Sequence, residues 1–331
     1  MIQRLTPQVF IPGLSALAMK RLESVTIKDE AGIENDMVTL VISDKGYDVE
    51  WISEGREIQV FIGYKETGLY DYGLYEVDNV NHNEPTSGPV FNIQARAMKT
   101  HTNQIKKPLS RHHDDLTLGQ IVQKIASENG FKSVVDPSVS GVYYHHVAQY
   151  SESGLNLLTR LALQHDCFVK TEKNIIYFKP KDVSNGTITI DKGRSMLQYG
   201  NRPIGVSVNA SNIDSRNKYK GVKCSFMNRD EGKTVYVTKG SEPYFEVKAR
   251  QESKKLAKQK CNDKMKEIDR NAKISINLPG EPGLKASYDV ILVNFRPEIC
   301  AMSPWKSVSV THTFNQSGFT SSTECEVNPK K

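Results

Sequence analysis

The stretch SRHHDDLTLGQ, residues 110–120, places two histidines beside two aspartates. Such side chains bind divalent metals and transfer protons in enzymes. Adjacent residues of an extended segment point to opposite sides, so at most two of His112, His113, Asp114 and Asp115 could face one metal ion. The pattern therefore favours a solvated linker and a helix N-terminus, where the two aspartates supply favourable negative charge, over a metal site.

Other groupings give no stronger sign of chemistry. His145 and His146 have no HExxH spacing and no acidic partner nearby in sequence, which predicts a loop or a strand end. The segment Gly232-Lys233-Thr234 is similar to the end of a phosphate loop, but Met227 stands where that motif requires its first glycine, so a hairpin turn is expected. We predict that the protein is not an enzyme and has no catalytic, cofactor-binding or metal-ligating residues and no cofactor.

A lysine-rich segment, approximately residues 248–272, has the periodicity of one long helix. Lysine-rich helices can line nucleic-acid surfaces, so a basic nucleic-acid-binding protein is an alternative function. Interspersed acidic residues and a formal charge of only +6 favour a solvated face with ion pairs. The lysines are Lys254, Lys255, Lys258, Lys260, Lys264 and Lys266, and the acidic residues are Glu252, Asp263, Glu267 and Asp269.

Length and composition predict an ordinary soluble protein of two or three domains. The chain has 331 residues, of which 38% are hydrophobic and 25% charged. It contains no apolar run of the roughly 20 residues that a membrane helix requires and no secretory signal, so we expect no membrane binding and folding in a cytoplasm. Five widely spaced cysteines, without a CxxC pair, indicate reduced structural thiols.

The order of predicted elements indicates a mainly β chain with an α+β insert: two similar β-barrel domains flank a small α+β domain. Residues 1–105 contain short strands and form the first barrel. Residues 106–182 contain two helices and a hairpin; Thr117 and Gln120 form a capping box, and Ser151 or Ser153 caps the second helix. Residues 183–331 form the second barrel, with the long charged helix inside it.

An internal similarity appears when the sequence is shifted by 230 positions. The matched pairs, in one register without gaps, are Val60 with Val290, Ile62 with Leu292, Tyr75 with Trp305, Val80 with Val310, His82 with His312 and Gly88 with Gly318. This register predicts a duplicated barrel, in which the two histidines share a packing or hydrogen-bonding role. Three such chains around an axis would present six similar modules in a ring, which could meet a six-fold partner.

The order of several segments resembles the late control D proteins of contractile-tailed phages, which are tail hub proteins related to the amino-terminal part of the VgrG spike. The segments are RLESVTIKDEAGIENDMVTLVISD, GREIQVFIGY, YGLYEVDNVNH, LTLGQIVQKIASENGF and SESGLNLLTRLALQHDCFVKTEKNIIYFKP. The closing phrase W..V.V.H.....GFT falls at Trp305, Val308, Val310, His312, Gly318, Phe319 and Thr320. The chain departs from the family at Gly154, where an acidic residue is common.

This resemblance implies a structural baseplate hub in the virion tail, assembled in the host bacterial cytoplasm. The implied protein is a homotrimer that joins the six-fold tail tube to the trimeric spike. It contacts the tape-measure protein and other baseplate proteins, and DNA only passes through its lumen. A tailocin or another contractile injection system is an alternative setting. A cell-wall hydrolase is disfavoured, because no pair of placed carboxylates or metal constellation stands out.

Overall fold

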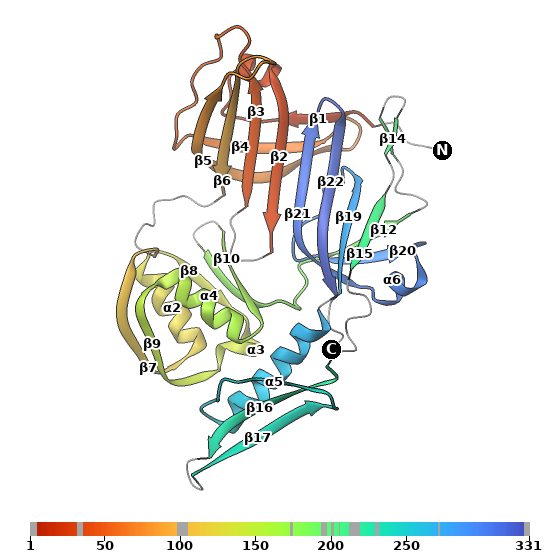
Figure 1. Ribbon diagram of the computed structural model, residues 1–331. Helices are drawn as coiled ribbons and strands as arrows, with labels where there is room; N and C mark the ends of the chain where they lie inside the picture. The colour runs from red at the N-terminus through yellow and green to blue at the C-terminus, as the bar shows by residue number, and fades with distance from the viewer. Residues whose placement is uncertain are drawn as a thin grey trace. The chain divides into compact units, whose positions relative to one another are not determined.

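The computed structural model describes residues 5–31, 36–97, 105–172, 175–192, 197–199, 202–204, 206–211, 219–228, 232–270 and 272–327. The chain forms two compact units. Unit 1 comprises Met1–His101, Ser184–Asn209 and Ser275–Cys325, and unit 2 comprises Thr102–Val183, Ala210–Ile274 and Glu326–Lys331. The predicted mainly β class with little helix is confirmed (Figure 1).

One sheet of twelve strands dominates the described fold. Its strands are β1 (Pro7–Phe10), β2 (Leu22–Glu30), β3 (Met37–Ser43), β4 (Glu57–Tyr64), β5 (Gly68–Asn83), β6 (Val90–Arg96), β12 (Thr187–Asp191), β15 (Ser207–Ser211), β19 (Lys273–Pro279), β20 (Asp289–Val293), β21 (Trp305–Asn315) and β22 (Gly318–Val327). Short helices α1 (Ala16–Lys20) and α6 (Pro297–Ala301) and the two-stranded sheet of β13 (Leu197–Tyr199) and β14 (Arg202–Ile204) accompany it.

The sheet contains a duplication of the kind that the shifted alignment predicts. The first repeat, β1–β6, follows the path β1-β4-β5-β6-β3-β2, and the second repeat follows the path β12-β20-β21-β22-β19-β15. If the strands of each repeat are counted in chain order, both paths run from the first strand to the fourth, fifth, sixth, third and second. One difference is the outermost pair, because β1 is antiparallel to β4 whereas β12 is parallel to β20.

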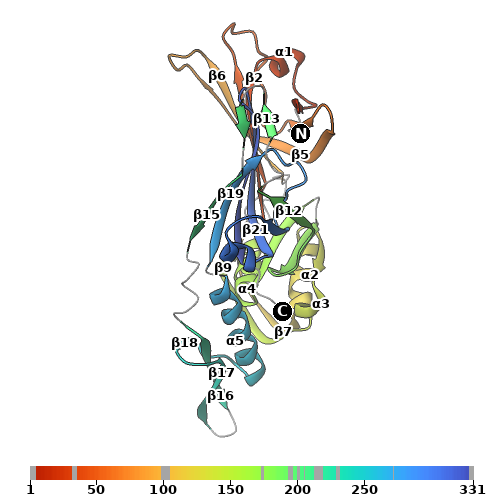
Figure 2. The same ribbon diagram turned by 90° about the vertical axis from the view of Figure 1, so that its right-hand side faces the viewer.

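The two repeats are joined by backbone pairing between β2 and β21. These strands run antiparallel from Ser24 opposite Asn315 to Glu30 opposite Ser309; Figure 1 shows them side by side, and Figure 2 views the same sheet nearly edge-on. The first and last β-rich segments of the chain therefore belong to one continuous sheet, although the α+β segment separates them in sequence.

Unit 2 combines two small sheets with helices on a common core, to which a hairpin and one long helix are added. Its elements are β7 (Pro108–Thr117), α2 (Leu118–Glu128), β8 (Lys132–Val135), α3 (Pro137–Ser140), β9 (Tyr143–Ser153), α4 (Gly154–Gln164), β10 (Cys167–Glu172), β11 (Ile175–Pro180), β16 (Gly221–Asn228), β17 (Lys233–Gly240), β18 (Tyr244–Glu246) and α5 (Lys254–Asp269). The predicted capping box at Thr117 and Gln120 is confirmed, and Ser153 caps α4.

The long helix and the hairpin before it group differently from the prediction. Residues 210–274, which the prediction assigned to the second barrel, belong to the same unit as residues 102–183. The physical reason is contact with the α+β core: Leu256 of α5 packs against its hydrophobic cluster, and Arg270 pairs with the buried Asp166. The helix also starts later than predicted, where the Ser253 side chain accepts from the Leu256 N–H. The three-domain division itself stays a prediction.

None of the helices in these described ranges is long and apolar enough to cross a membrane. The cysteines are free thiols, and all but the half-buried Cys300 are buried, which agrees with the predicted structural role.

Alternation along β2 gives a matched pair of variants. Ile27 is fully buried in the core of unit 1, whereas its neighbour Thr26 is half-buried on the opposite face. We expect Ile27→Ala to lower the free energy of unfolding of unit 1 by about 3 kcal/mol through a cavity, and Thr26→Ala to lower it by about 1 kcal/mol or less. Urea unfolding followed by tryptophan fluorescence measures this difference, since Trp51 and Trp305 both lie in unit 1. Equal losses would contradict the assigned faces.

Candidate assembly surface

One face of the large sheet carries rows of uncharged polar side chains. In the register of five neighbouring strands, Thr313 of β21 lies opposite Thr26, Thr26 opposite Thr39, Thr39 opposite Gln94, and Gln94 opposite Asn79. Directly opposite residues point to the same face of a sheet, so these five side chains form one continuous row across both repeats.

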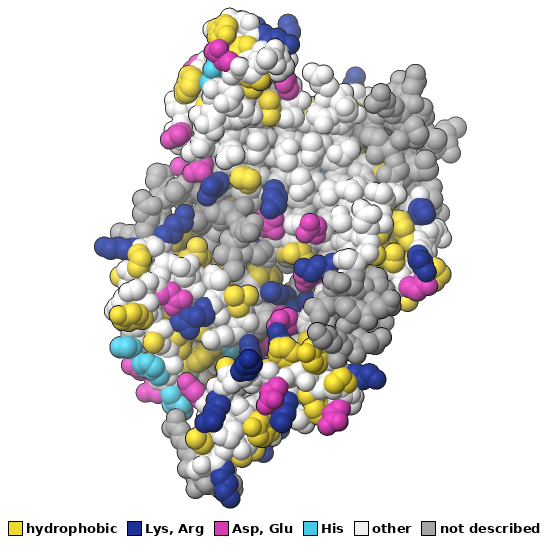
Figure 3. Space-filling model, viewed as in Figure 1, with side chains coloured by type: hydrophobic (Ala, Val, Ile, Leu, Met, Phe, Trp, Pro, Cys, Tyr) yellow, Lys and Arg dark blue, Asp and Glu magenta, His cyan; other side chains and the backbone are white. Residues whose placement is uncertain are grey.

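A second row continues the same surface. It runs Asn315, Ser24, Val41, Asn92 and Asn81, again through directly opposite partners on β21, β2, β3, β6 and β5. Figure 3 shows that the area over this sheet is mostly white, the colour of backbone and uncharged polar side chains. The face is therefore broad, polar and nearly free of charge.

Two basic residues that border this face are paired with acidic residues. The Lys28 ammonium lies 2.6 Å from the Glu30 carboxylate, and the Arg96 guanidinium lies 2.9 Å from the Asp78 carboxylate. Pairing of opposite charges weakens the field that each would project, so the face presents no strong attraction for a polyanion.

The opposite face of the same strands forms the core. The row His312, Ile27, Val38, Ala95 and Val77 follows the same register, and each of these residues is at most 2% exposed. This alternation of apolar and polar residues explains why the polar face is displayed: the apolar side chains take the interior.

His312 is held in this core by two hydrogen bonds. Its Nε2 lies 3.0 Å from the Leu284 carbonyl oxygen, so it carries the proton and donates, and its Nδ1, 2.8 Å from the Ser321 hydroxyl, accepts. The Tyr72 ring packs edge-on at 5.0 Å. Burial lowers the pKa of His312 to about 4, which keeps the imidazole neutral at physiological pH.

His82, the counterpart of His312 in the first repeat, also has a packing role. Its Nε2 lies 3.1 Å from an Asp44 carboxylate oxygen, and its ring packs edge-on against Phe91 at 4.7 Å. Phe91 corresponds to Ser321 under the same shift of 230 positions. The two histidines thus occupy matching places in the sheet but have different partners, which agrees with the predicted structural role.

The histidines and aspartates of the opening stretch lie in a strand, not in a linker. Residues 112–115 are part of β7, which pairs with β9 and so brings them beside His145 and His146. The His146 ring nitrogen lies 2.6 Å from Asp114, and His145 lies 3.4 Å from Asp115. The linker prediction was wrong because strand pairing satisfies this backbone, and α2 begins three residues after Asp115.

The structure thus supplies the acidic partners that His145 and His146 lack in sequence. Figure 3 shows histidines and acidic side chains gathered at the surface there. His113, in contrast, is buried, with its Nε2 3.2 Å from Gln149. Among the described residues, no group of three or more His, Cys, Asp or Glu side chains could hold a metal ion.

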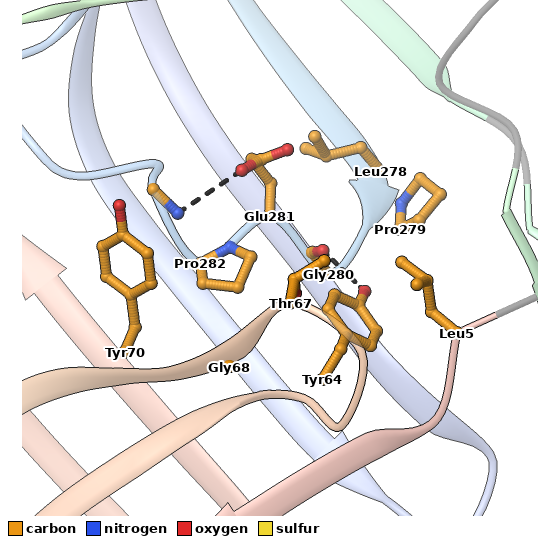
Figure 4. Close-up of a pocket in the computed structure, with 11 residues that line it drawn as sticks. Leu5, Tyr64, Thr67, Gly68, Tyr70, Leu278, Pro279, Gly280, Glu281 and Pro282 are labelled. Atoms are coloured by element: carbon orange, nitrogen blue, oxygen red, sulfur yellow. Dashed lines mark hydrogen bonds between the residues drawn. The ribbon is translucent and has the colours of Figure 1, made fainter. Parts of the chain in front are cut away.

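A hollow of about 380 Å³ lies in unit 1 between the β4–β5 turn and the connection from β19 to β20 (Figure 4). The Tyr64 hydroxyl donates to the Gly280 carbonyl oxygen at 2.6 Å and so links the two repeats. A Cβ added at Gly280 would lie 2.0 Å from the Phe319 ring, so a larger residue there requires the ring to move. Glu281 accepts from the Gly283 N–H at 3.4 Å, and burial raises its pKa. Glu281 supplies the one carboxylate among the described residues that line this hollow.

The lysines of α5 take part in contacts within unit 2. The Lys266 ammonium lies 2.8 Å from Asp182, Lys264 pairs with Glu267 and lies 4.8 Å from the Phe245 ring centre, and Lys260 donates to the Gln164 carbonyl oxygen. These contacts agree with the predicted ion-paired face. The predicted hairpin at Gly232 is confirmed, since Asn228 of β16 pairs with Lys233 of β17; residues 229–231 of its turn lie outside the described ranges.

A buried ion pair joins the C-terminal end of α5 to the residue before β10 within unit 2. Arg270 forms an ion pair with Asp166, and both side chains are 7% exposed. Asp263 on α5 has a buried carboxylate oxygen without a hydrogen-bond partner in the structure, and burial raises its pKa to about 6. Ionised Asp263 is therefore a cost to the folded state at neutral pH.

No family model matches the chain. A curated relative from Escherichia phage P2, named probable baseplate hub protein, is 26% identical over 357 residues, with 93% of this chain and 88% of the relative covered. The chain is similar to a phage baseplate hub protein. The resemblance predicted from the sequence is therefore confirmed.

Solved structures share the fold of this chain. The 43 kDa tail protein of prophage MuSo2 from Shewanella oneidensis has a TM-score of 0.68 and 12% identity, covering 97% of this chain and 98% of its own. A chain of the Francisella PdpA–VgrG complex has a TM-score of 0.55 and 10% identity, covering 100% of this chain and 59% of its own. At these identities the likeness shows the fold alone.

Sequence reasoning missed the polar rows as a surface. Alternation within β2 or β6 could have identified Thr26 or Gln94 as outward-facing. The neighbours of these residues depend on the pairing of β2 with β21, between segments nearly 290 residues apart in the chain, for which the sequence carries no local signal.

Asp263 gives a prediction with a defined pH dependence. A carboxyl whose pKa is raised to about 6 in the folded state binds its proton more tightly there than in the unfolded chain, so its ionisation costs stability as the pH rises from about 4 to about 6. Asp263→Asn removes this cost. We expect it to raise the free energy of unfolding of unit 2 by about 1–2 kcal/mol at pH 8 and to have almost no effect at pH 4.

Urea unfolding at the two pH values, followed by circular dichroism at 222 nm, measures this effect, since the long helices lie in unit 2. Glu246→Gln, at an exposed site on β18 of the same unit, is the control and should change stability by less than about 0.5 kcal/mol at either pH. A gain from Asp263→Asn that is equal at pH 4 and pH 8 would contradict the assignment.

Proposed function

We propose that this chain is the central hub of a contractile-tail baseplate, assembled as a homotrimer that joins the six-fold tail tube to the trimeric spike. The observation that carries the proposal is the similarity to the P2 protein over 93% of this chain. The duplication supports it physically, because two repeats with the same strand path in each chain give six related modules in a trimer. Such an assembly matches a three-fold partner on one side and a six-fold partner on the other.

The polar face of the sheet suits the lining of a channel through this ring. The Thr, Ser, Asn and Gln side chains of these rows can hydrogen-bond to water without adding charge, and Lys28 and Arg96 at the border are paired with acidic residues. Since contacts to DNA phosphates depend on unpaired Lys and Arg, a wall of this kind would let DNA or a tape-measure protein slide past with little binding.

The remaining roles follow from the hub. Its partners are the tube, the spike, the tape-measure protein and other baseplate proteins, and each stable interface buries on the order of 2,000 Å² or more. The protein acts in the virion tail baseplate after assembly in the host bacterial cytoplasm, without a catalytic reaction or a cofactor. A tailocin or another contractile injection system would use the same geometry. The α5 lysines give no second candidate function, because several are engaged within unit 2.

Light scattering of the purified chain across a concentration series, alone and with the candidate spike, tests this function. We expect three times the 37.2-kDa mass of the chain, either alone or in the spike complex, because a two-repeat chain leaves its ring incomplete as a monomer. The spike alone is the control for its own mass. A chain that stays monomeric with the spike would overturn the hub, and DNA binding would be tested next.

A further inference from the structure

The two repeats use equivalent strand edges differently. On β21, β20 pairs with Trp305 and Lys306, and further along the same edge β2 pairs with Ser309–Asn315. The opposite edge of β21 carries β22. One edge of β21 is thus shared by a strand of its own repeat and a strand of the other repeat.

The equivalent edge of β5 is filled only in its first half. β4 pairs with β5 from Gly68 to Glu76, and β6 occupies the opposite edge of β5 up to Asn83. Under the shift of 230 positions, Ser309–Asn315 correspond to residues 79–85. In the described part of the chain, no strand pairs with residues 79–83 at the place where β2 sits on β21.

The strand that could fill this place is also present in each chain. β2 ends the path of the first repeat, and β15 ends the path of the second. β15 pairs with β19 on one side, and no described strand covers its other edge. Its residues Ser207, Asn209, Ala210 and Ser211 are exposed.

The two edges carry few of the features that normally prevent strand addition: β5 has a bulge between Val77 and Asn79, and Glu84 and Pro85 follow the open stretch. Natural proteins protect open edges with lysine, proline or bulges. Residues 79–83 read Asn-Val-Asn-His-Asn and β15 reads Ser-Val-Asn-Ala-Ser, so neither contains a formal charge or a proline. Both edges can accept a further strand without desolvating an ion.

We propose that β15 of one chain pairs antiparallel with Asn79–Asn83 of the next chain and so repeats between chains the β2–β21 pairing found within a chain. The partner is a second copy of this chain, and the contact is heterologous, which produces a ring when its rotation closes. The polar rows then continue across the seam, because Asn79 ends the first row and Asn81 ends the second. This inference rests on the proposed homotrimer and identifies the strand edges that form it.

Cysteine cross-linking tests the seam. Cα atoms of directly opposite antiparallel residues lie about 4.5–5.5 Å apart, within the range for a disulfide. Asn81→Cys is combined in turn with Ser207→Cys, Asn209→Cys or Ser211→Cys, which point to one face and cover the possible registers. After mild oxidation, we expect one combination to give chains linked in twos and threes on a non-reducing gel, and the Asn81→Cys single variant to give none.

The matched control is Thr26→Cys with Thr313→Cys, whose Cα atoms are direct partners in β2 and β21. This pair should form a disulfide within one chain and stay at monomer mass on the same gel. Both readouts are taken on protein whose mass in solution is measured alone and with the spike.

The outcomes separate the two proposals. A trimer in solution whose control disulfide forms while none of the three combinations links chains would overturn the seam and leave the hub standing. A monomer that persists with the spike would overturn the hub and the seam together. Linked trimers from one combination alone would establish both the edges and their register.

Discussion

The pairing of β2 with β21 is the contact on which the rest of this structure depends. Seven residue pairs, from Ser24–Asn315 to Glu30–Ser309, join strands from opposite ends of the chain. Backbone hydrogen bonds in a sheet leave little freedom in register, because a slip of one residue would move Ile27 and Val25 from the core to the polar face. Both the shared core and the polar rows are therefore set by this one ladder.

The same pairing of β2 with β21 joins the two repeats into one compact unit. Each repeat alone would end in open strand edges, which favour association with other chains. Within the chain, one such edge is closed by the other repeat, and the Tyr64–Gly280 hydrogen bond links the repeats a second time. The equivalent edge of β5 stays open among the described strands because a chain has only two repeats. The first repeat supplies β2 to the second repeat, but no third repeat supplies a strand to β5.

The two repeats also differ in the partners of their equivalent histidines. His312 is buried, bonded to Ser321 and Leu284, whereas His82 is half-buried and bonded to Asp44. The described strands of unit 2 do not repeat this sheet pattern; Lys266 of α5 and the buried Asp166–Arg270 pair hold a hairpin and a helix to an α+β core. Its exposed histidines pair with aspartates across two strands, an arrangement that strand pairing creates from residues about 30 apart in sequence.

Local sequence features were sufficient for most elements and for the duplication. The alternation in Leu22–Glu30, the capping box at Thr117 and the shift of 230 positions all rest on side-chain periods or short-range hydrogen bonds that a single segment carries. The tertiary structure alone decided that β2 lies beside β21, that α5 packs on β16 and not in the second repeat, and that residues 112–115 pair with β9. These outcomes depend on which distant segments bury surface against one another. The free energy of that burial arises from the pair of segments, so neither segment alone reveals it.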